Sequence, residues 1–131
     1  MNLEQQFKNF DMPSWPQAVR IDWRRLEIDD DTGNPGDYLF YLFQSDEYRE
    51  ADQARLDARR RGDWSFIGIR AEATIYVPIG QGCFSAYTLT SPGVWGIESD
   101  SDESYFAEVY EDEKAQLIDA LKLIGKAAET L

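Results

Sequence analysis

Carboxylates are concentrated in one stretch of the chain, WGIESDSDESYFAEVYEDEK, which runs from Trp95 to Lys114. Between Glu98 and Glu113 the stretch is rich in Asp and Glu and contains no Lys or Arg. Two interpretations are open. The acids either stabilise the start of a solvated helix, or they form a surface that binds a positively charged partner.

Spacing separates the two interpretations only in part. Acids before a helix and in its first turn favour the helix dipole, which explains the first members of the run. Later acids are three and four residues apart on the face opposite the apolar stripe, where neighbouring side chains lie roughly 5–6 Å apart, as phosphates do along a nucleic-acid strand. A tryptophan is a frequent anchor at protein interfaces. The predicted partner-binding set is Glu98, Asp100, Asp102, Glu103, Glu108, Glu111, Asp112 and Trp95.

Catalytic chemistry has few candidates in this sequence. The chain has no histidine, so the commonest general base and metal ligand is missing. The single Cys83 has no histidine to activate it and sits in an acidic chain, which favours the unreactive thiol. Glu113 falls within the apolar stripe of its helix; either the helix overhangs the sheet there, or the carboxylate pairs with Arg70 or lies alone in a pocket. We therefore expect no enzyme, no catalytic residue, no cofactor and no metal.

Composition predicts a single folded domain over residues 1–131, with a variable N-terminal segment (1–37) before an α+β core (38–131). The chain has 43% hydrophobic and 14% aromatic residues, which is outside the disordered class. No apolar run is long enough to span a bilayer, and the N-terminus does not resemble a signal peptide, so a cytoplasmic location in a host cell is expected.

The net charge of −12 opposes binding to nucleic acid and to anionic membranes and favours basic partners; simple solubility is the competing explanation. The one basic patch, Arg55 and Arg59 to Arg61, is expected to pair with nearby acids or with an acidic helix of another subunit.

Hydrophobic periodicity places these residues on an α+β framework. A short helix with Leu3, Phe7 and Phe10 on one side is followed by a segment from Val19 to Ile28 that fits a strand, with a possible bulge at Arg24–Arg25, or a helix. A polar loop follows, and residues 38–44 read as a buried strand or a hydrophobic anchor. An exposed helix then runs from 46 to 61, with Ser45 as its N-cap and Gly62 as its stop.

Residues 64–99 alternate as an antiparallel meander. Its first strand places Ile67, Ile69, Ala71, Ala73, Ile75 and Val77 on one face, and turns follow at 80–82 and 91–93. A long C-terminal helix, about 102 to 129, carries an apolar stripe and is capped by Asp100 or Ser101. The predicted fold class is α+β: a small antiparallel β-meander with a long C-terminal helix packed on one face and a second, more exposed helix before the sheet.

The segments DEYREADQARLDARRRGDWSFIGIRAEATIYVPIG and LTSPGVWGIESDSDESYFAEVYEDEKAQL together cover about 46 to 121. They resemble a family of small acidic proteins encoded by bacteriophages, prophages and plasmids, through the core SPGVWGIESDS. The resemblance implies a genetic setting and supplies no catalytic residue. Small acidic proteins in that setting include inhibitors of host defence, of the anti-CRISPR and anti-restriction types.

The resemblance and the charge together predict a stoichiometric inhibitor of a host defence system. It would bind a defence protein or ribonucleoprotein through a basic surface, would not bind nucleic acid directly, and would occlude the nucleic-acid site. The alternative is a non-catalytic phage accessory or assembly protein whose charge maintains solubility. Oligomeric state, the identity of the partner and the binding face stay open.

Overall fold

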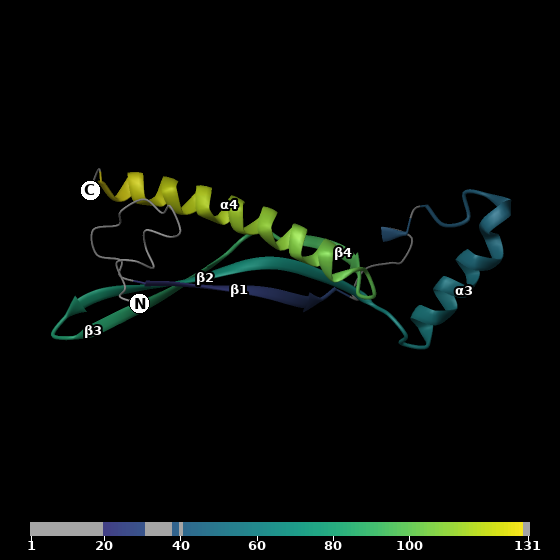
Figure 1. Cartoon of the computed structure of the whole chain (residues 1–131), viewed down its shortest axis with the longest axis horizontal. Coiled ribbons are helices and arrows are strands. Elements are labelled where there is room, and N and C mark those ends of the chain that lie inside the picture. Colours follow the sequence, from purple (N-terminus) through teal and green to yellow (C-terminus); the bar gives the residue numbers. More distant parts are fainter. Residues whose placement is uncertain (1–19, 31–37, 40, 130–131) are drawn as a thin grey trace.

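The computed structural model describes residues 20–30, 38–39 and 41–129. The expected N-terminal helix around Leu3, Phe7 and Phe10 and the polar loop at 31–37 lie outside these residues. Within them, the chain forms one antiparallel four-stranded sheet with a long helix, α4 (Glu103–Glu129), lying along one face (Figure 1). A shorter helix, α3 (Arg49–Arg60), lies beyond one end of the sheet (Figure 1). The predicted α+β fold is therefore confirmed.

The central strand is β2 (Phe66–Gly80), which pairs with each of the other three. β1 (Arg20–Asp29) runs along one of its edges. β3 (Cys83–Thr90) and β4 (Val94–Glu98) follow one another along the other edge. A simple meander would instead place β4 beside β3. Because β3 pairs only with the second half of β2, the first half is left to bind β4.

The register of β1 corrects the sequence-based expectation of a bulge. The ten residues of β1 pair with β2 without a shift, from Arg20 opposite Tyr76 to Asp29 opposite Ile67. Residues directly opposite one another share a face, so Arg25, opposite Ala71, lies on the face that α4 covers. Leu26, opposite Arg70, lies on the other face, where a bulge would not have placed it.

Alternation along β2 produces the core because every second side chain points toward α4. One apolar cluster joins β1 and β2 to the middle of α4, and a second joins β2 and β4 to its first turns. Their buried members are Ile21, Ile69, Ala71, Ala73, Ile75, Ile97, Phe106, Val109, Leu117 and Leu121. The predicted docking of the C-terminal helix on this face is thus confirmed.

Ile124, which was expected in the same contact, is 41% exposed. Figure 1 shows α4 rising away from the sheet toward its C-terminal end, so Leu121 is the last helix residue in the described core. The helical period alone did not reveal this divergence, because it specifies the face of a residue and not its distance from the sheet.

Glu113 is buried, with only 2% of its surface exposed, and two of its three sequence-based readings, the overhang and the pair with Arg70, are wrong. The helix does not overhang the sheet there, and Arg70 does not pair with the carboxylate. Instead the Ser91 hydroxyl donates a hydrogen bond to Glu113 at 2.9 Å, as do the Gly93 N–H and, at 3.1 Å, the Gln116 amide. These donors replace the water that the carboxylate loses, so Glu113 fastens α4 to the β3–β4 connection.

A smaller apolar cluster holds α3 at the end of the sheet. Trp64 and Phe66 pack with Leu39, and Leu56 of α3 covers them. Residues 41–44 form a turn instead of the strand that was one reading of 38–44, and the buried Leu39 fits the other reading, an anchor. A 3-10 turn, η1 (Asp46–Tyr48), leads into α3, and the Ser45 side chain caps it as expected. None of the residues of α3 is buried, in agreement with the predicted exposure.

Truncation of Leu117 tests the docking of α4 directly. Leu117→Ala should lower the free energy of unfolding by roughly 2–5 kcal/mol, because it opens a cavity between α4 and the sheet. Leu123→Ala, on the exposed side of the same helix, should change it by less than about 0.5 kcal/mol. Urea unfolding followed by circular dichroism measures both. Similar losses for the two variants would mean that α4 docks through another face.

Candidate partner-binding surface

The predicted partner-binding residues do not form one surface. The structure divides them among five places: a salt-bridge cluster at the α3 end of the sheet, a pair with β1, the residue before α4, the outer face of α4, and the opposite face of the sheet. Only Asp102, which precedes α4, and the carboxylates on the outer face of α4 make no ion pair within the described residues. The helix or strand that carries each residue determines where its side chain lies.

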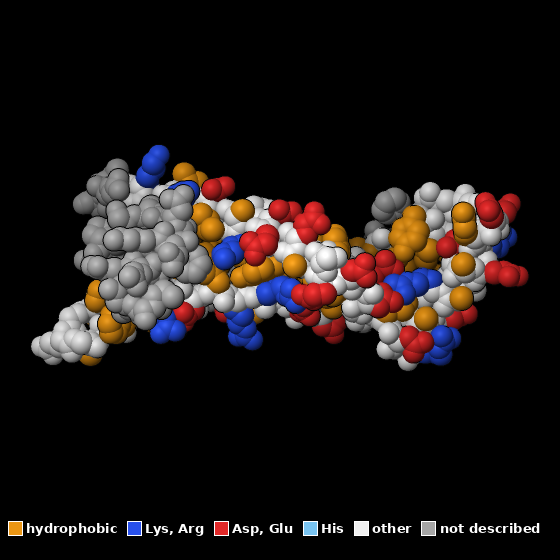
Figure 2. Space-filling model, in the orientation of Figure 1, with side chains coloured by type: hydrophobic (Ala, Val, Ile, Leu, Met, Phe, Trp, Pro, Cys, Tyr) orange, Lys and Arg blue, Asp and Glu red, His pale blue; other side chains and the backbone are white. Residues whose placement is uncertain are grey.

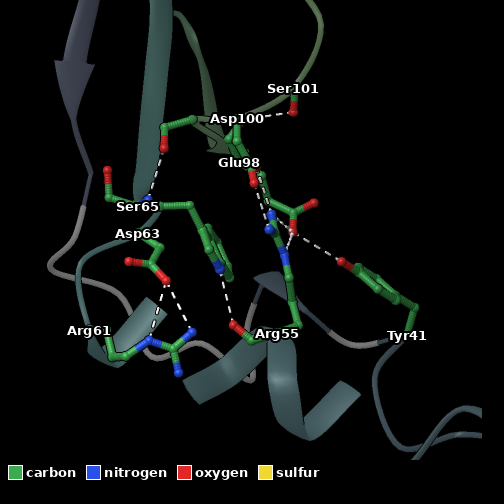
Figure 3. A network of polar contacts seen from close by, with 10 residues as sticks. Tyr41, Arg55, Arg61, Asp63, Ser65, Glu98, Asp100 and Ser101 are labelled. Atoms are coloured by element: carbon green, nitrogen blue, oxygen red, sulfur yellow. Dashed lines mark hydrogen bonds and ion pairs between the residues drawn. The ribbon is translucent and has the colours of Figure 1, made fainter. Parts of the chain in front are cut away.

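Glu98 and Asp100 belong to the first place, where both bind Arg55 of α3 (Figure 3). Glu98 ends β4 and Asp100 lies in the turn that follows, so the strand end presents both carboxylates to α3. The guanidinium donates to Glu98 Oε1 at 2.7 and 3.0 Å and to the two Asp100 oxygens at 2.7 Å each. Paired bonds of this kind are the strongest that arginine makes.

The surroundings of Arg55 fix its position. Its guanidinium carbon lies 3.8 Å from the centre of the Trp64 ring, a cation–π contact, and the Trp64 indole N–H donates to the Arg55 carbonyl at 3.0 Å. The Tyr41 hydroxyl donates to Glu98 at 3.2 Å (Figure 3). Hydrogen bonds with Asp100 raise the pKa of Arg55, and the same bonds hold the pKa of Asp100 below its ordinary value of 3.8. Burial raises the pKa of Tyr41.

Glu103, in the first turn of α4, also forms an ion pair with an arginine of the same chain. Arg25 of β1 donates to its two carboxylate oxygens at 2.6 and 3.1 Å, and lies 3.2 Å from Glu27 as well. These hydrogen bonds lower the pKa of Glu103. The pairing exists because β1 has no bulge, which places Arg25 on the side of α4.

Glu108, Glu111, Asp112 and Asp102 are exposed carboxylates of the set that no described arginine or lysine pairs with. None of them makes an ion pair with another residue of the described ranges. The first three lie on the outer face of α4, and Figure 2 shows acidic side chains along this helix. Asp102 precedes the helix, and its carbonyl accepts from the N–H groups of Tyr105 and Phe106. The Ser101 hydroxyl donates to the Glu98 carbonyl at 2.7 Å, so Ser101 is not the expected cap.

Trp95 lies on the opposite side of the sheet from α4. Its ring lies directly over Gly68, where an added Cβ would overlap the ring carbons. Gly68 stands between Ile67 and Ile69, which face α4, so Gly68 and Trp95 lie on the other side of the sheet. The indole N–H donates to the Pro92 carbonyl at 3.1 Å. Trp95 therefore does not share a surface with the acids of α4, contrary to the set predicted from the sequence.

The basic patch on α3 is satisfied locally, as expected. Arg60 lies 3.6 Å from Asp57, and Arg61 lies 3.0 Å from Asp63. Arg59 is placed 5.0 Å from the centre of the Phe66 ring. With Arg55 already bound to Glu98 and Asp100, the patch offers little free charge to a polyanion.

Sequence reasoning expected Arg55 to pair with acids but did not identify Glu98 and Asp100 as its partners, and it did not predict the roles of Arg25 and Tyr41. Arg55 and Glu98 are 43 positions apart, and Arg25 and Glu103 are 78 apart. No local spacing rule connects residues at such separations. Only the acid-rich composition indicated that scattered arginines would find partners.

The described residues contain neither a metal-binding cluster nor a membrane-spanning helix. No group of three or more Cys, Asp or Glu side chains lies close enough together to hold a metal ion in that part of the chain. None of the helices there combines the length and apolar character needed to cross a bilayer.

Comparison of the chain with protein-family models, with curated proteins and with solved structures found no match.

Removal of the Arg55 side chain should loosen α3. Arg55→Ala should lower the free energy of unfolding by about 1–3 kcal/mol, since it leaves the half-buried Glu98 without its partner. Amide hydrogen exchange should accelerate in α3 more than in α4. The matched control is Arg49→Ala, which removes an exposed pair with Asp46 on the same helix and should have an effect under about 0.5 kcal/mol. Equal effects of the two variants would contradict a special role for Arg55.

The Arg55–Asp100 pair should also give stability a pH dependence. Because folding lowers the pKa of Asp100, its contribution is complete above about pH 5 and disappears as the pH falls below 3.8 toward the folded pKa. The difference in unfolding free energy between wild type and Asp100→Asn should therefore shrink on acidification from pH 6 to pH 3. Asp119→Asn, on the exposed face of α4, removes an equal charge and should change the free energy of unfolding by less than about 0.5 kcal/mol at pH 6. A gap for Asp100→Asn that stays constant with pH would refute the assignment.

Proposed function

We propose that this protein is a stoichiometric inhibitor, encoded by a mobile genetic element, that blocks a nucleic-acid-binding site of a host defence system. The binding surface is the outer face of α4, centred on Glu108, Glu111 and Asp112. Its partner is a defence protein or ribonucleoprotein with a basic groove. The carboxylates take the place of phosphates against Lys and Arg side chains of that groove.

The observation that supports this proposal is the contrast between two groups of acids in the same run. Glu98, Asp100 and Glu103 are neutralised by Arg55 and Arg25, as a structural role requires. The acids on the outer face of α4 are exposed and make no ion pair within the described residues. Mutual repulsion of these like charges at helical spacing destabilises the helix slightly, so their clustering needs a reason other than folding.

The position of this face suits an inhibitor. α4 is the longest helix described, at 27 residues, and one side of it is anchored to the sheet by the apolar core and by Glu113. The backbone that carries its outer charges is already ordered, so binding would cost side-chain entropy but little backbone entropy. The net charge of −12 would also accelerate the approach to a basic groove.

The competing function is that of a non-catalytic phage accessory or assembly protein, in which the acids of α4 serve solubility alone. The two functions differ in what they require of the charge. An inhibitor loses affinity when the charge of α4 is reversed, whereas an accessory protein of this kind keeps its partner and changes only its tendency to aggregate.

Charge reversal at matched sites tests the proposal. The partner is first recovered by affinity capture from defence-bearing host cells and identified by mass spectrometry, and its affinity is then measured by calorimetry. Glu108→Lys/Glu111→Lys should weaken binding at least about tenfold, or about 1.4 kcal/mol, by placing cations against a basic groove. Glu47→Lys/Glu50→Lys, which makes the same charge change at the same spacing near α3, should change affinity less than about threefold.

Two further readouts accompany this comparison. Affinity of the wild-type protein should fall steeply with added salt, because exposed charges are screened within about 10 Å at 0.1 M. DNA or guide RNA should compete for the same groove. An unchanged affinity of Glu108→Lys/Glu111→Lys, in a variant that unfolds like wild type, would remove the outer face of α4 from the mechanism.

A further inference from the structure

β3 forms an edge of the sheet. It pairs with β2 on one side, and no other described strand pairs with it on the other. Half of the backbone N–H and C=O groups of an edge strand point away from its neighbour and can bind another strand. β4 does not cover this edge, because it pairs with β2 farther along the sheet.

The two edges of the sheet differ in how they are protected. Soluble proteins usually place charged side chains, prolines or bulges on an exposed edge to prevent pairing with another chain. The β1 edge is protected in this way, by Arg20, Asp22, Arg24, Arg25, Glu27 and Asp29. The eight residues of β3, CFSAYTLT, contain no charge and no proline, and most favour strands.

Exposed apolar side chains lie on β3 and at the end of β2, on both faces of the sheet. Ile79 at the end of β2 and Phe84 and Tyr87 on β3 are each more than half exposed. Figure 2 shows the end of the β2–β3 hairpin, at lower left, as hydrophobic and uncharged atoms without acidic or basic side chains. In a chain with a net charge of −12, an uncharged apolar strand edge is a local exception.

We propose that β3 pairs with β3 of a second copy of this chain, in antiparallel orientation, to form a homodimer with one continuous eight-stranded sheet. The two-fold axis is perpendicular to the sheet and passes near Ala86 or Tyr87, at the middle of the strand. Facing residues then lie on the same side of the sheet. The interface is self-complementary and uses each β3 once, and the charged β1 edges prevent further growth.

Charge permits a second copy at this edge, although it opposes contact between copies elsewhere on the surface. Two molecules of net charge −12 repel one another over most of their surfaces, but no charged side chain lies on either β3. The nearest charged strand is β2, and the β2 strands of the two copies would be three strand spacings apart, roughly 14 Å. That separation exceeds the screening length of about 8–10 Å at physiological salt.

Dimerisation goes beyond the proposed function and can be tested without a partner. Because the axis is perpendicular to the sheet, both α4 helices lie on the same side of the continuous sheet. The dimer would therefore present two acidic outer faces in one direction. Self-association should strengthen with added salt, which screens the repulsion between copies, whereas binding of a basic partner should weaken. The two proposals can consequently fail separately.

The first experiment is analytical ultracentrifugation of the full chain over a wide concentration range. Wild type should show a monomer–dimer equilibrium. Tyr87→Glu should raise the dimer dissociation constant at least about tenfold, since it places two carboxylates close together near the axis. Tyr48→Glu makes the same change at a side chain of similar exposure, 59% against 55%, near α3, and should stay within about twofold of wild type.

The second experiment locates the interface by cross-linking. In a Cys83→Ser background, either Ala86→Cys or Tyr87→Cys should form an intermolecular disulfide under mild oxidation, because a residue on the axis faces itself at roughly 4.5–5.5 Å between Cα atoms. Tyr48→Cys should stay reduced. A wild-type protein that sediments as a monomer at every concentration would overturn the proposal. So would a dimer that Tyr87→Glu leaves intact and that neither cysteine cross-links.

Discussion

Every other strand of the sheet depends on the pairing of β2. This 15-residue strand pairs with β1 along one edge and with β3 and β4 along the other. Ile and Ala side chains at alternate positions of β2 form the apolar surface on which α4 packs. The small Ala71 and Ala73 allow the helix to approach closely, and the larger Ile69 and Ile75 fill the space on either side. Without this strand, neither the helix nor the three short strands would have a surface to bury against.

Electrostatics acts on this framework in two ways. Where the chain needs a connection between distant elements, it pairs arginine with carboxylate: Arg55 joins α3 to the end of β4, and Arg25 joins β1 to the start of α4. Glu113 makes a third connection through hydrogen bonds alone. The other acids of the run are Asp102, before α4, and Glu108, Glu111 and Asp112 on the outside of α4. The fold thus separates carboxylates that connect its elements from carboxylates that stay exposed and unpaired within the described residues, although both lie in one continuous run of sequence.

Features that depend on residues close together in the sequence could be predicted, and features that depend on residues far apart in the sequence could not. Strand alternation in β2, the helical period of α4, the Ser45 cap and the turn between β2 and β3 depend on neighbours within a few residues, and all were predicted correctly. The bulge expected in β1 was wrong because Arg24 and Arg25 interrupt the apolar alternation without interrupting the pairing. The candidate site was predicted as one surface, and the fold divided it, since Glu98 and Glu103 found arginines at large sequence separations.

The sequence by itself determined the α+β class, the apolar face shared by β2 and α4, and the strongly acidic character of the chain. These properties follow from composition and periodicity, which are local quantities. Only the tertiary structure decided which carboxylates are free, that Trp95 and the acids of α4 lie on opposite sides of the sheet, and that β3 is left as an uncharged edge. Each of these depends on which elements become neighbours in space, and that choice is made by the burial of the whole core at once.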